Sequence, residues 1–305
     1  MTQKGAKLIL DFKGSNDWYS EDETEEKLLN FFKTSNNETG VSELLKDKSN
    51  WAMQYHLSPI RRNLLSWYDF TPQSTLLEIG GGCGAFTGMF CEKVSQVTSV
   101  ELTERRAKII FNRHKNFDNL TVFAGDVRNV NLTQKFDYVT SIGVMEYVGK
   151  NNKIKDPYLD FLTLLRGLLK KDGVFVLAIE NKLGLKYWSG CTEDHSGILF
   201  DSIEDYSVDD SFRTFSKKEL DALLLQAGFQ EFFYYYPFPD YKMPLEIFSQ
   251  DYLPNGNHEV RQSLFPFKDY SAKRNSLFDE KKVLGSLSKA GLFEHFSNSF
   301  LIFAK

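Results

Sequence analysis

Residues 75–101 read TLLEIGGGCGAFTGMFCEKVSQVTSVE, and this stretch indicates the architecture of the chain. An apolar run at 75–79 is followed by three consecutive glycines and then by a segment with helical spacing. A second apolar run, at 96–100, ends in Glu101. This order predicts a strand, a tight turn, a helix and a second strand, which form a βαβ unit. Glycines let a ligand approach the main chain closely, so we expect a ligand at the turn.

The composition is that of a soluble globular protein. The chain has 305 residues, 42% of them hydrophobic, and a formal net charge of −4. This charge gives no general attraction for phosphate backbones, so no nucleic-acid partner is expected. Cys83, Cys91 and Cys191 have neither the even count of a disulfide framework nor the close spacing of a zinc site, which favours a cytoplasmic compartment. The apolar runs are strand-sized, so neither a signal peptide nor a membrane span is expected.

Strand-like and helical segments alternate through the middle of the chain. The seven expected strands are 75–79, 96–100, 120–126, 136–144, 174–179, 231–238 and 297–305. An amphipathic helix at 158–173 is expected to end at Gly173, and a capping box formed by Ser216 and Glu219 starts a helix at 216. The pattern predicts an α/β protein with a doubly wound, seven-stranded, mostly parallel sheet.

Three further segments flank or interrupt this sheet. Residues 1–70 are expected to form an N-terminal helical cap, with a candidate strand at 7–12, and residues 71–305 the main domain. Residues 181–215 form a long irregular connection, and connections of that length are usually functional, so we expect a substrate loop there. Residues 239–291 are rich in aromatic residues and proline and are expected to form an insertion that acts as a lid.

Four features of the core identify a known family. They are Glu78-x-Gly80-x-Gly82-x-Gly84 after the first strand, Glu101, Gly125-Asp126 after the third strand, and SIGVMEYV after the fourth. In this order and spacing they resemble a class I S-adenosylmethionine-dependent methyltransferase with a Rossmann-like fold, over residues 72–237 and the closing strand. The chain departs from the pattern at Tyr147, where many relatives have histidine.

The resemblance implies S-adenosylmethionine as the cofactor. Glu101 would accept hydrogen bonds from the ribose hydroxyls, and Asp126 would accept one from the adenine amino group beside the Val127 backbone N–H. The glycines would line the amino-acid end of the cofactor, with Glu78 ordering their turn, and Ser141 would pass beneath the methyl group. The expected cofactor-binding residues are Glu78, Gly80, Gly82, Gly84, Glu101, Asp126, Val127 and Ser141.

A nicotinamide-dependent dehydrogenase is the main alternative, because Gly80-x-Gly82-x-x-Ala85 also satisfies the loose dinucleotide fingerprint. Three observations favour the methyltransferase. No second mononucleotide-binding half follows the fifth strand, Gly125-Asp126 suits adenine recognition, and the order of the last segments is typical of the methyltransferase sheet.

Acceptor chemistry is expected in the segment ENKLGLKYWSGCTEDHSGILFDSIEDY, residues 180–206. His195 is the candidate general base because histidine titrates near neutral pH, and either Asp194 or Glu193 would orient it. A surface Asp-His turn is the alternative. The expected catalytic residues are His195, Asp194 and Glu180. His114 is expected to be exposed on a helix, and no metal site is expected, since Glu146 alone does not form one.

The acceptor class follows from a second resemblance. The segments GLKYWSG, EDHSG, RTFS and YPFPDYKMP resemble a bacterial group of methyltransferases associated with surface-polysaccharide assembly. This resemblance implies O-methylation of a polar small molecule, a saccharide or a glycan precursor. N-methylation of an amino sugar, peptide or protein stays open, as does a cofactor-binding scaffold without turnover. The rings at 232–238 either stack on a sugar or pack in the core.

Overall fold

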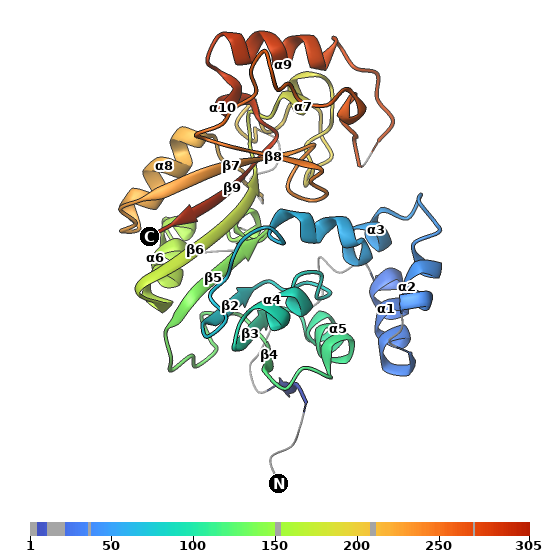
Figure 1. The fold of residues 1–305 in the computed structure, drawn as a ribbon, viewed down its shortest axis with the longest axis vertical. Helices are drawn as coiled ribbons and strands as arrows, with labels where there is room; N and C mark the ends of the chain where they lie inside the picture. The colour runs from blue at the N-terminus through green and yellow to red at the C-terminus, as the bar shows by residue number, and fades with distance from the viewer. Residues whose placement is uncertain (1–4, 11–21, 36–37, 150–153, 208–211, 271) are drawn as a thin grey trace. The chain divides into compact units, whose positions relative to one another are not determined.

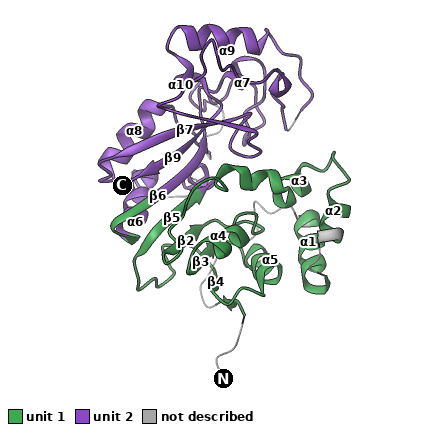
Figure 2. Cartoon of the chain, viewed as in Figure 1, with its two compact units in different colours: residues 1–141, 168–174 green, residues 142–167, 175–305 purple. Residues whose placement is uncertain are grey.

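The structure is a computed structural model that describes residues 5–10, 22–35, 38–149, 154–207, 212–270 and 272–305 (Figure 1). The chain forms two compact units (Figure 2). Unit 1 contains residues 1–141 and 168–174, and unit 2 contains residues 142–167 and 175–305. None of the described helices combines the length and apolarity that crossing a membrane requires.

Unit 1 is built on a parallel sheet. Its strands are β1 (Lys7–Ile9), β2 (Thr75–Ile79), β3 (Gln96–Glu101), β4 (Leu120–Ala124) and β5 (Phe136–Ile142). Their order is β1-β4-β3-β2-β5, with parallel pairing of β1 with β4, β4 with β3, β3 with β2, and β2 with β5. The side chains of Leu76, Leu77, Val97 and Val122 are fully buried, as expected for parallel strands, which read as nearly continuous apolar runs.

The helices of unit 1 include an N-terminal group and two that follow the glycine turn and β3. They are α1 (Asp22–Thr34), α2 (Glu38–Leu44), α3 (Trp51–Leu57), the 3-10 helix η1 (Pro59–Leu64), α4 (Thr87–Lys93) and α5 (Glu104–His114). Leu28 and Phe32 of α1 pack with Cys83, the residue inside the glycine turn, and with Ile109 of α5. The N-terminal helices and the turn therefore share one hydrophobic core.

Unit 2 is built on antiparallel strands. The strands are β6 (Leu169–Glu180), which begins in unit 1, β7 (Phe232–Phe238), β8 (Glu246–Ser249) and β9 (Ser299–Ala304), in the order β6-β9-β7-β8. All three pairings are antiparallel. The helices are η2 (Met145–Tyr147), α6 (Pro157–Leu168), α7 (Leu185–Trp188), α8 (Lys217–Gln226), η3 (Gln262–Leu264), α9 (Glu280–Lys289) and α10 (Phe293–Phe296).

Two rings of β7 resolve an alternative left open by the sequence. Tyr234 and Tyr236 are 1% and 0% exposed, and both rings lie against Phe300 of β9. Buried rings cannot stack on a sugar at the surface, so these two belong to the hydrophobic core. The predicted capping box is confirmed, because the Ser216 and Glu219 side chains each bond the other residue's backbone N–H at the start of α8.

The strands differ from the expectation in number and direction. The described residues contain nine strands, and four of them pair antiparallel. The two extra strands are β1 and β8. Residues 7–9 of the candidate N-terminal strand pair with β4 and so extend the sheet, while residues 11 and 12 lie outside the described part. Strand β8 forms inside the 239–291 insertion because it pairs with β7.

The helix expected at 158–173 was predicted to end too late. Helix α6 ends at Leu168, and Gly173 lies inside β6. A Cβ atom at Gly173 would lie 2.9 Å from the carbonyl oxygen of Phe136, the first residue of β5. The glycine therefore allows a close approach to the β5 backbone and does not cap a helix.

Candidate functional site

The glycine turn in unit 1 has a conformation and a space that require glycine. Gly80, Gly82 and Gly84 have φ angles of 68°, 56° and 78°, in the left-handed region that L side chains rarely adopt. At Gly81 the reason is space, since a Cβ atom there would lie 2.6 Å from Oγ of Ser99. At Gly82 a Cβ atom would meet nothing within 4 Å, so the main chain there is open to the approach of a ligand.

Glu101 ends β3 beside this turn and is 2% exposed. Its Oε2 accepts a hydrogen bond from the Gly82 backbone N–H at 2.8 Å, and its Oε1 accepts one from Thr103 at 3.1 Å. Burial raises the pKa of Glu101, and the charge of Arg106 and the two N–H groups oppose that effect. Each carboxylate oxygen has a second lone pair, so Glu101 can accept further hydrogen bonds from ribose hydroxyls.

Glu78 stabilises the glycine turn through its side-chain hydrogen bonds. Its Oε2 accepts hydrogen bonds from Oγ1 of Thr87 and Oγ of Ser99, both at 2.7 Å, and so joins β2, β3 and α4. Burial raises the pKa of Glu78 to about 7. This geometry fits the predicted role of Glu78 in ordering the turn.

Asp126, Val127 and Ser141 lie near the ends of β4 and β5. The Asp126 carboxylate accepts from the Arg128 backbone N–H at 2.9 Å and pairs with the Arg128 guanidinium at 3.2 Å. Val127 is 8% exposed. Oγ of Ser141 is buried and has no hydrogen-bond partner among the described residues. The adenine and methyl contacts expected of these residues stay predictions.

His114 was predicted to be exposed, and that prediction was wrong. Its ring is 7% exposed, and its Nε2 lies 2.8 Å from the carbonyl oxygen of Gly84. A Cβ atom at Gly84 would come within 2.9 Å of the ring, so the glycine leaves the space that the imidazole fills. Burial lowers the pKa of His114 to about 3, so the ring is neutral.

Glu25 of α1 is a buried residue that was not predicted from the sequence. Glu25 is fully buried, and its Oε1 lies 2.7 Å from Nε of Arg106, whose charge also acts on Glu101. Its position in the sequence could have indicated burial. Glu25 lies three residues before Leu28 and four before Leu29, on the apolar face of the helix. An acidic residue on such a face needs a buried partner.

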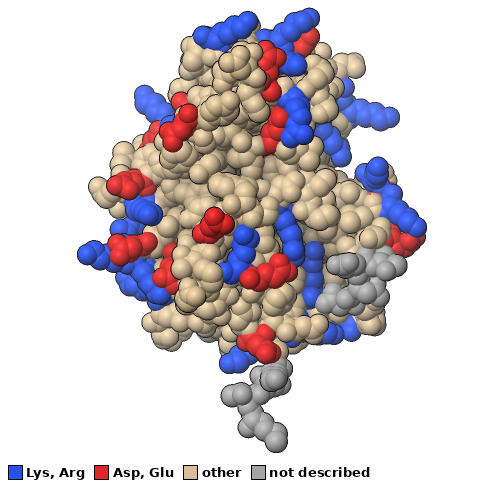
Figure 3. Space-filling view, viewed as in Figure 1, with Lys and Arg blue, Asp and Glu red and all other residues tan. Residues whose placement is uncertain are grey.

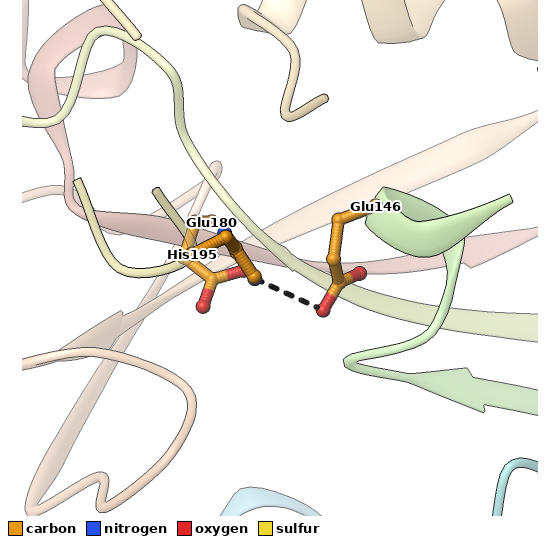
Figure 4. Close-up of side chains that lie close together, drawn as sticks. All are labelled: Glu146, Glu180 and His195. Carbon is orange, nitrogen blue, oxygen red and sulfur yellow. Dashed lines mark ion pairs between the residues drawn. The ribbon is translucent and has the colours of Figure 1, made fainter. Parts of the chain in front are cut away.

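Unit 2 contains a separate cluster of titratable side chains. Glu146 lies on η2, Glu180 ends β6, and His195 lies in the loop between α7 and α8. One side-chain ligand atom from each lies within 4.8 Å of the other two. Figure 4 shows Glu146 and His195 pointing toward each other, with His195 Nε2 3.6 Å from Glu146 Oε1.

His195 is oriented by Glu193. Its Nδ1 lies 2.9 Å from Oε1 of Glu193, and its side chain is 5% exposed, which excludes a surface turn. The imidazole also contacts two aromatic rings: Tyr147 meets it edge-on at 5.3 Å and Phe212 stacks on it at 5.7 Å, measured between ring centroids. These contacts fix the ring plane and leave Nε2 facing Glu146.

Asp194, the other candidate orienting residue, contacts different partners. Its Oδ2 accepts hydrogen bonds from Tyr187 Oη and Lys242 Nζ, both at 3.0 Å, and it pairs with Lys186. Lys242 also pairs with Glu180, so Asp194 and Glu180 share one ammonium group. Lys186 was not predicted from the sequence. Its signal was weak, because one lysine in an apolar segment has no spacing pattern of its own.

The pKa directions follow from this crowding of charge. Burial raises the pKa of Glu146. Burial also opposes ionisation of Glu180, but Lys242 brings the pKa of that carboxyl below its usual value. Burial alone would lower the pKa of His195, yet Tyr147 and the carboxylates around it raise that pKa well above its usual value. The cluster is therefore dominated by carboxylates.

Residues 77–175 match the protein family described as "Methyltransferase domain". This match spans the glycine turn, Glu101, Asp126 and Ser141, and it confirms the methyltransferase resemblance for that part of the chain. It also supports S-adenosylmethionine as the cofactor, which the glycine turn and the buried acceptor Glu101 fit.

Curated proteins match the chain over a short stretch. Ribosomal RNA small subunit methyltransferase A of Syntrophus aciditrophicus is 26% identical over 84 residues, which are 28% of this chain and 28% of that protein. Its probable counterpart in Methanosarcina acetivorans is 34% identical over 73 residues, 24% of this chain and 27% of that protein. The chain thus spans little more than a quarter of the length of these relatives.

Among solved structures, the chain is similar to one from Thermotoga maritima, described as a SAM-dependent methyltransferase and possible histamine N-methyltransferase. The sequence identity is 17%, and the likeness covers 87% of this chain and 98% of that one, with a TM-score of 0.49.

Proposed function

We propose that the protein is an S-adenosylmethionine-dependent methyltransferase that methylates a hydroxyl group of a polar small molecule, a saccharide or a glycan precursor. The match of residues 77–175 supports methyl transfer. The contact between Glu193 and His195 is the observation that carries the choice of a hydroxyl acceptor, because a hydroxyl must lose its proton before or during the transfer. The saccharide class rests on the resemblance of segments such as GLKYWSG and YPFPDYKMP.

The residues of unit 2 have distinct roles in this proposal. Glu193 accepts a hydrogen bond from Nδ1–H of His195, so in the neutral ring the lone pair on Nε2 can receive the acceptor proton. The acceptor O–H bond breaks as the N–H bond forms, and the oxygen is then free to bond to carbon. The bound cofactor supplies a methyl group on a positively charged sulfur, and S-adenosylhomocysteine is the second product. The carboxylates around His195 raise its pKa well above the usual value, so the ring acts as a base only after it has lost its Nε2 proton.

A small acceptor is favoured over RNA, although the curated relatives are named as ribosomal RNA methyltransferases. Their similarity to this chain is limited to 84 and 73 residues. A net charge of −4 gives no broad attraction for a phosphate backbone. On the face drawn in Figure 3, basic and acidic side chains are interspersed in both units.

The first test is calorimetric titration of the purified protein with S-adenosylmethionine, S-adenosylhomocysteine and a nicotinamide dinucleotide. Micromolar binding of the first two that is lost in Glu101→Ala would support the cofactor site. Methyl-labelled cofactor is then offered with nucleotide-activated sugars, their amino-sugar analogues and RNA, and mass spectrometry and NMR identify the methylated atom. Tighter dinucleotide binding would overturn the proposal in favour of a dehydrogenase. Binding without transfer to any acceptor would favour a scaffold, and a methylated nitrogen would replace the hydroxyl acceptor.

A further inference from the structure

We propose that unit 2 binds one divalent cation, Mg²⁺ or Mn²⁺, between the carboxylates of Glu146 and Glu180 and beside His195. The inference rests on the proposed function in one respect, because the ion would hold the acceptor hydroxyl next to the base. Its binding can nevertheless be measured without any turnover.

The three side chains lie close together. Ligand atoms of Glu146, Glu180 and His195 lie within 4.8 Å of one another, although they come from η2, the end of β6 and a loop (Figure 4). Bonds of about 2.1 Å from Mg²⁺ to oxygen let one ion join oxygens up to about 4.2 Å apart. The spacing of the ligand atoms is therefore close to the separation that one ion can bridge.

One oxygen atom of each glutamate has no hydrogen-bond partner among the described residues. Glu146 and Glu180 are 1% and 0% exposed. Oε2 of each carboxylate is buried and accepts no hydrogen bond from the described residues. A buried acceptor without a partner costs about 1–3 kcal/mol, and more when the group is charged. A cation at this point would give both oxygens a partner.

The network of side chains around the site has an excess of acidic groups. It is a connected set of buried or nearly buried side chains linked by ion pairs, made of Glu146, Glu180, Glu193, Asp194, Asp240, Lys186, Lys242 and His195. This set has five carboxyl groups against two lysines and one histidine. Even with the imidazole protonated, the carboxyl groups of the set outnumber its positively charged groups by two. A divalent cation balances this excess.

The types of ligand favour a hard ion with open positions. Mg²⁺ is commonly held by one or two carboxylates together with water and substrate oxygens. Lys242 pairs with Oε1 of Glu180, so Oε2 is the oxygen available to the ion. A hydroxyl bound to the ion loses its proton more readily, and Nε2 of His195 is placed to receive it. The sequence predicted no metal site because Glu146 stood alone, and the fold adds Glu180 to it.

The test is titration of the chelator-treated full chain with Mn²⁺, followed by electron paramagnetic resonance and calorimetry. We expect one site per chain, competition by Mg²⁺, and a dissociation constant at least tenfold weaker in Glu146→Gln and in Glu180→Gln. Glu204→Gln is the matched control, because Glu204 is an exposed carboxylate of the same unit, and it should bind Mn²⁺ as the wild type does. Circular dichroism checks that each variant is folded.

No Mn²⁺ binding by the wild type at millimolar concentration would overturn the inference, whatever the variants do. Unchanged affinity in both glutamine variants would also overturn it, because the ion would then bind elsewhere. Cofactor binding by the metal-free protein tests the proposed function separately. If the metal-free protein transfers methyl groups at the full rate, the ion has no part in holding the acceptor and the proposed function stands, while the binding itself is decided by the titration.

Discussion

Nδ1 of His195 lies 2.9 Å from Oε1 of Glu193, two residues earlier in the same loop. The other oxygen of this carboxylate accepts hydrogen bonds from the backbone N–H groups of His195 and Ser196, at 2.6 and 2.7 Å. One carboxylate therefore fixes both the imidazole and the main chain that carries it. The direction of Nε2 depends on Glu193.

Glu193→Gln should lower the turnover number about 10- to 100-fold, as is usual when a carboxylate that orients a functional histidine is replaced. The amide still bonds to the loop, so the Kd for S-adenosylmethionine should stay unchanged. The measurement is kcat at saturating acceptor together with calorimetric cofactor binding. His195→Ala should lose about 10²–10⁴-fold, while Glu204→Gln should match the wild type. Wild-type kcat in His195→Ala would refute the base role.

Glu101→Gln should weaken S-adenosylmethionine binding by at least about tenfold, because hydrogen bonds to a charged group are worth about 1.5–3 kcal/mol. Glutamine keeps one acceptor oxygen for the backbone N–H of Gly82, so the fold should be kept. Titration calorimetry gives the Kd. Glu104→Gln, at an exposed glutamate of α5, is the control, and equal affinities in the two variants would contradict the ribose role of Glu101.

Glu78 should make the protein less stable as the pH rises toward neutrality. Its pKa is about 7 in the folded protein and about 4.5 in the unfolded chain, so folding favours the protonated form. The resulting stabilisation is complete below pH 4.5 and is lost as the pH rises through 7, at about 1.4 kcal/mol per pH unit. Urea unfolding of the wild type and of Glu78→Gln from pH 4.5 to 8 isolates this contribution. Parallel stability curves for the two proteins would refute it.

His114 should make the protein less stable as the pH falls, the opposite of the effect of Glu78. Its pKa is about 3 in the folded protein against 6.5 when exposed, so folding favours the neutral ring. This contribution is complete above pH 6.5 and is lost as the pH falls toward 3, at about 1.4 kcal/mol per pH unit. His114→Gln should remove that acid-dependent loss, because an amide can donate to the Gly84 carbonyl without titrating. The same slope in variant and wild type would show that other groups cause the loss.

Glu25→Ala should destabilise the protein by about 3 kcal/mol, because it leaves Arg106 without its buried partner. Urea unfolding measures the effect. Glu26→Ala, at an exposed neighbour in the same helix, is the control and should change stability by less than about 0.5 kcal/mol. Equal loss in both variants would assign the effect to the helix and not to the ion pair.

The sequence predicted the parts of the fold that local patterns control. The apolar run 75–79, the glycines after it and the capping box at Ser216 each act over a few residues, and each is present in the structure. Strand β8 was missed because its four residues become a strand only by pairing with β7. Likewise, Gly173 lies inside β6 and close to the backbone of Phe136, a contact that only the folded sheet creates.

Some residues of the candidate site could be predicted from the sequence, and others could not. Glu78, Glu101 and the glycines lie within one βαβ unit, so their proximity follows from the order of elements. Glu146, Glu180 and His195 are separated along the chain by a helix, a strand and a loop, so only the folded chain shows that they converge. Whether Glu193 or Asp194 orients His195 was equally beyond the sequence, because the loop backbone decides which side chain turns inward.

Cys83 links the glycine turn to helix α1. It lies within the glycine turn and also packs against Leu28 and Phe32 of α1, so the turn cannot rearrange without disturbing that helix. Ligand binding at the turn should therefore be linked thermodynamically to local unfolding of the first helices. Bound S-adenosylmethionine would then slow amide hydrogen exchange in α1, far along the sequence from the residues that touch it.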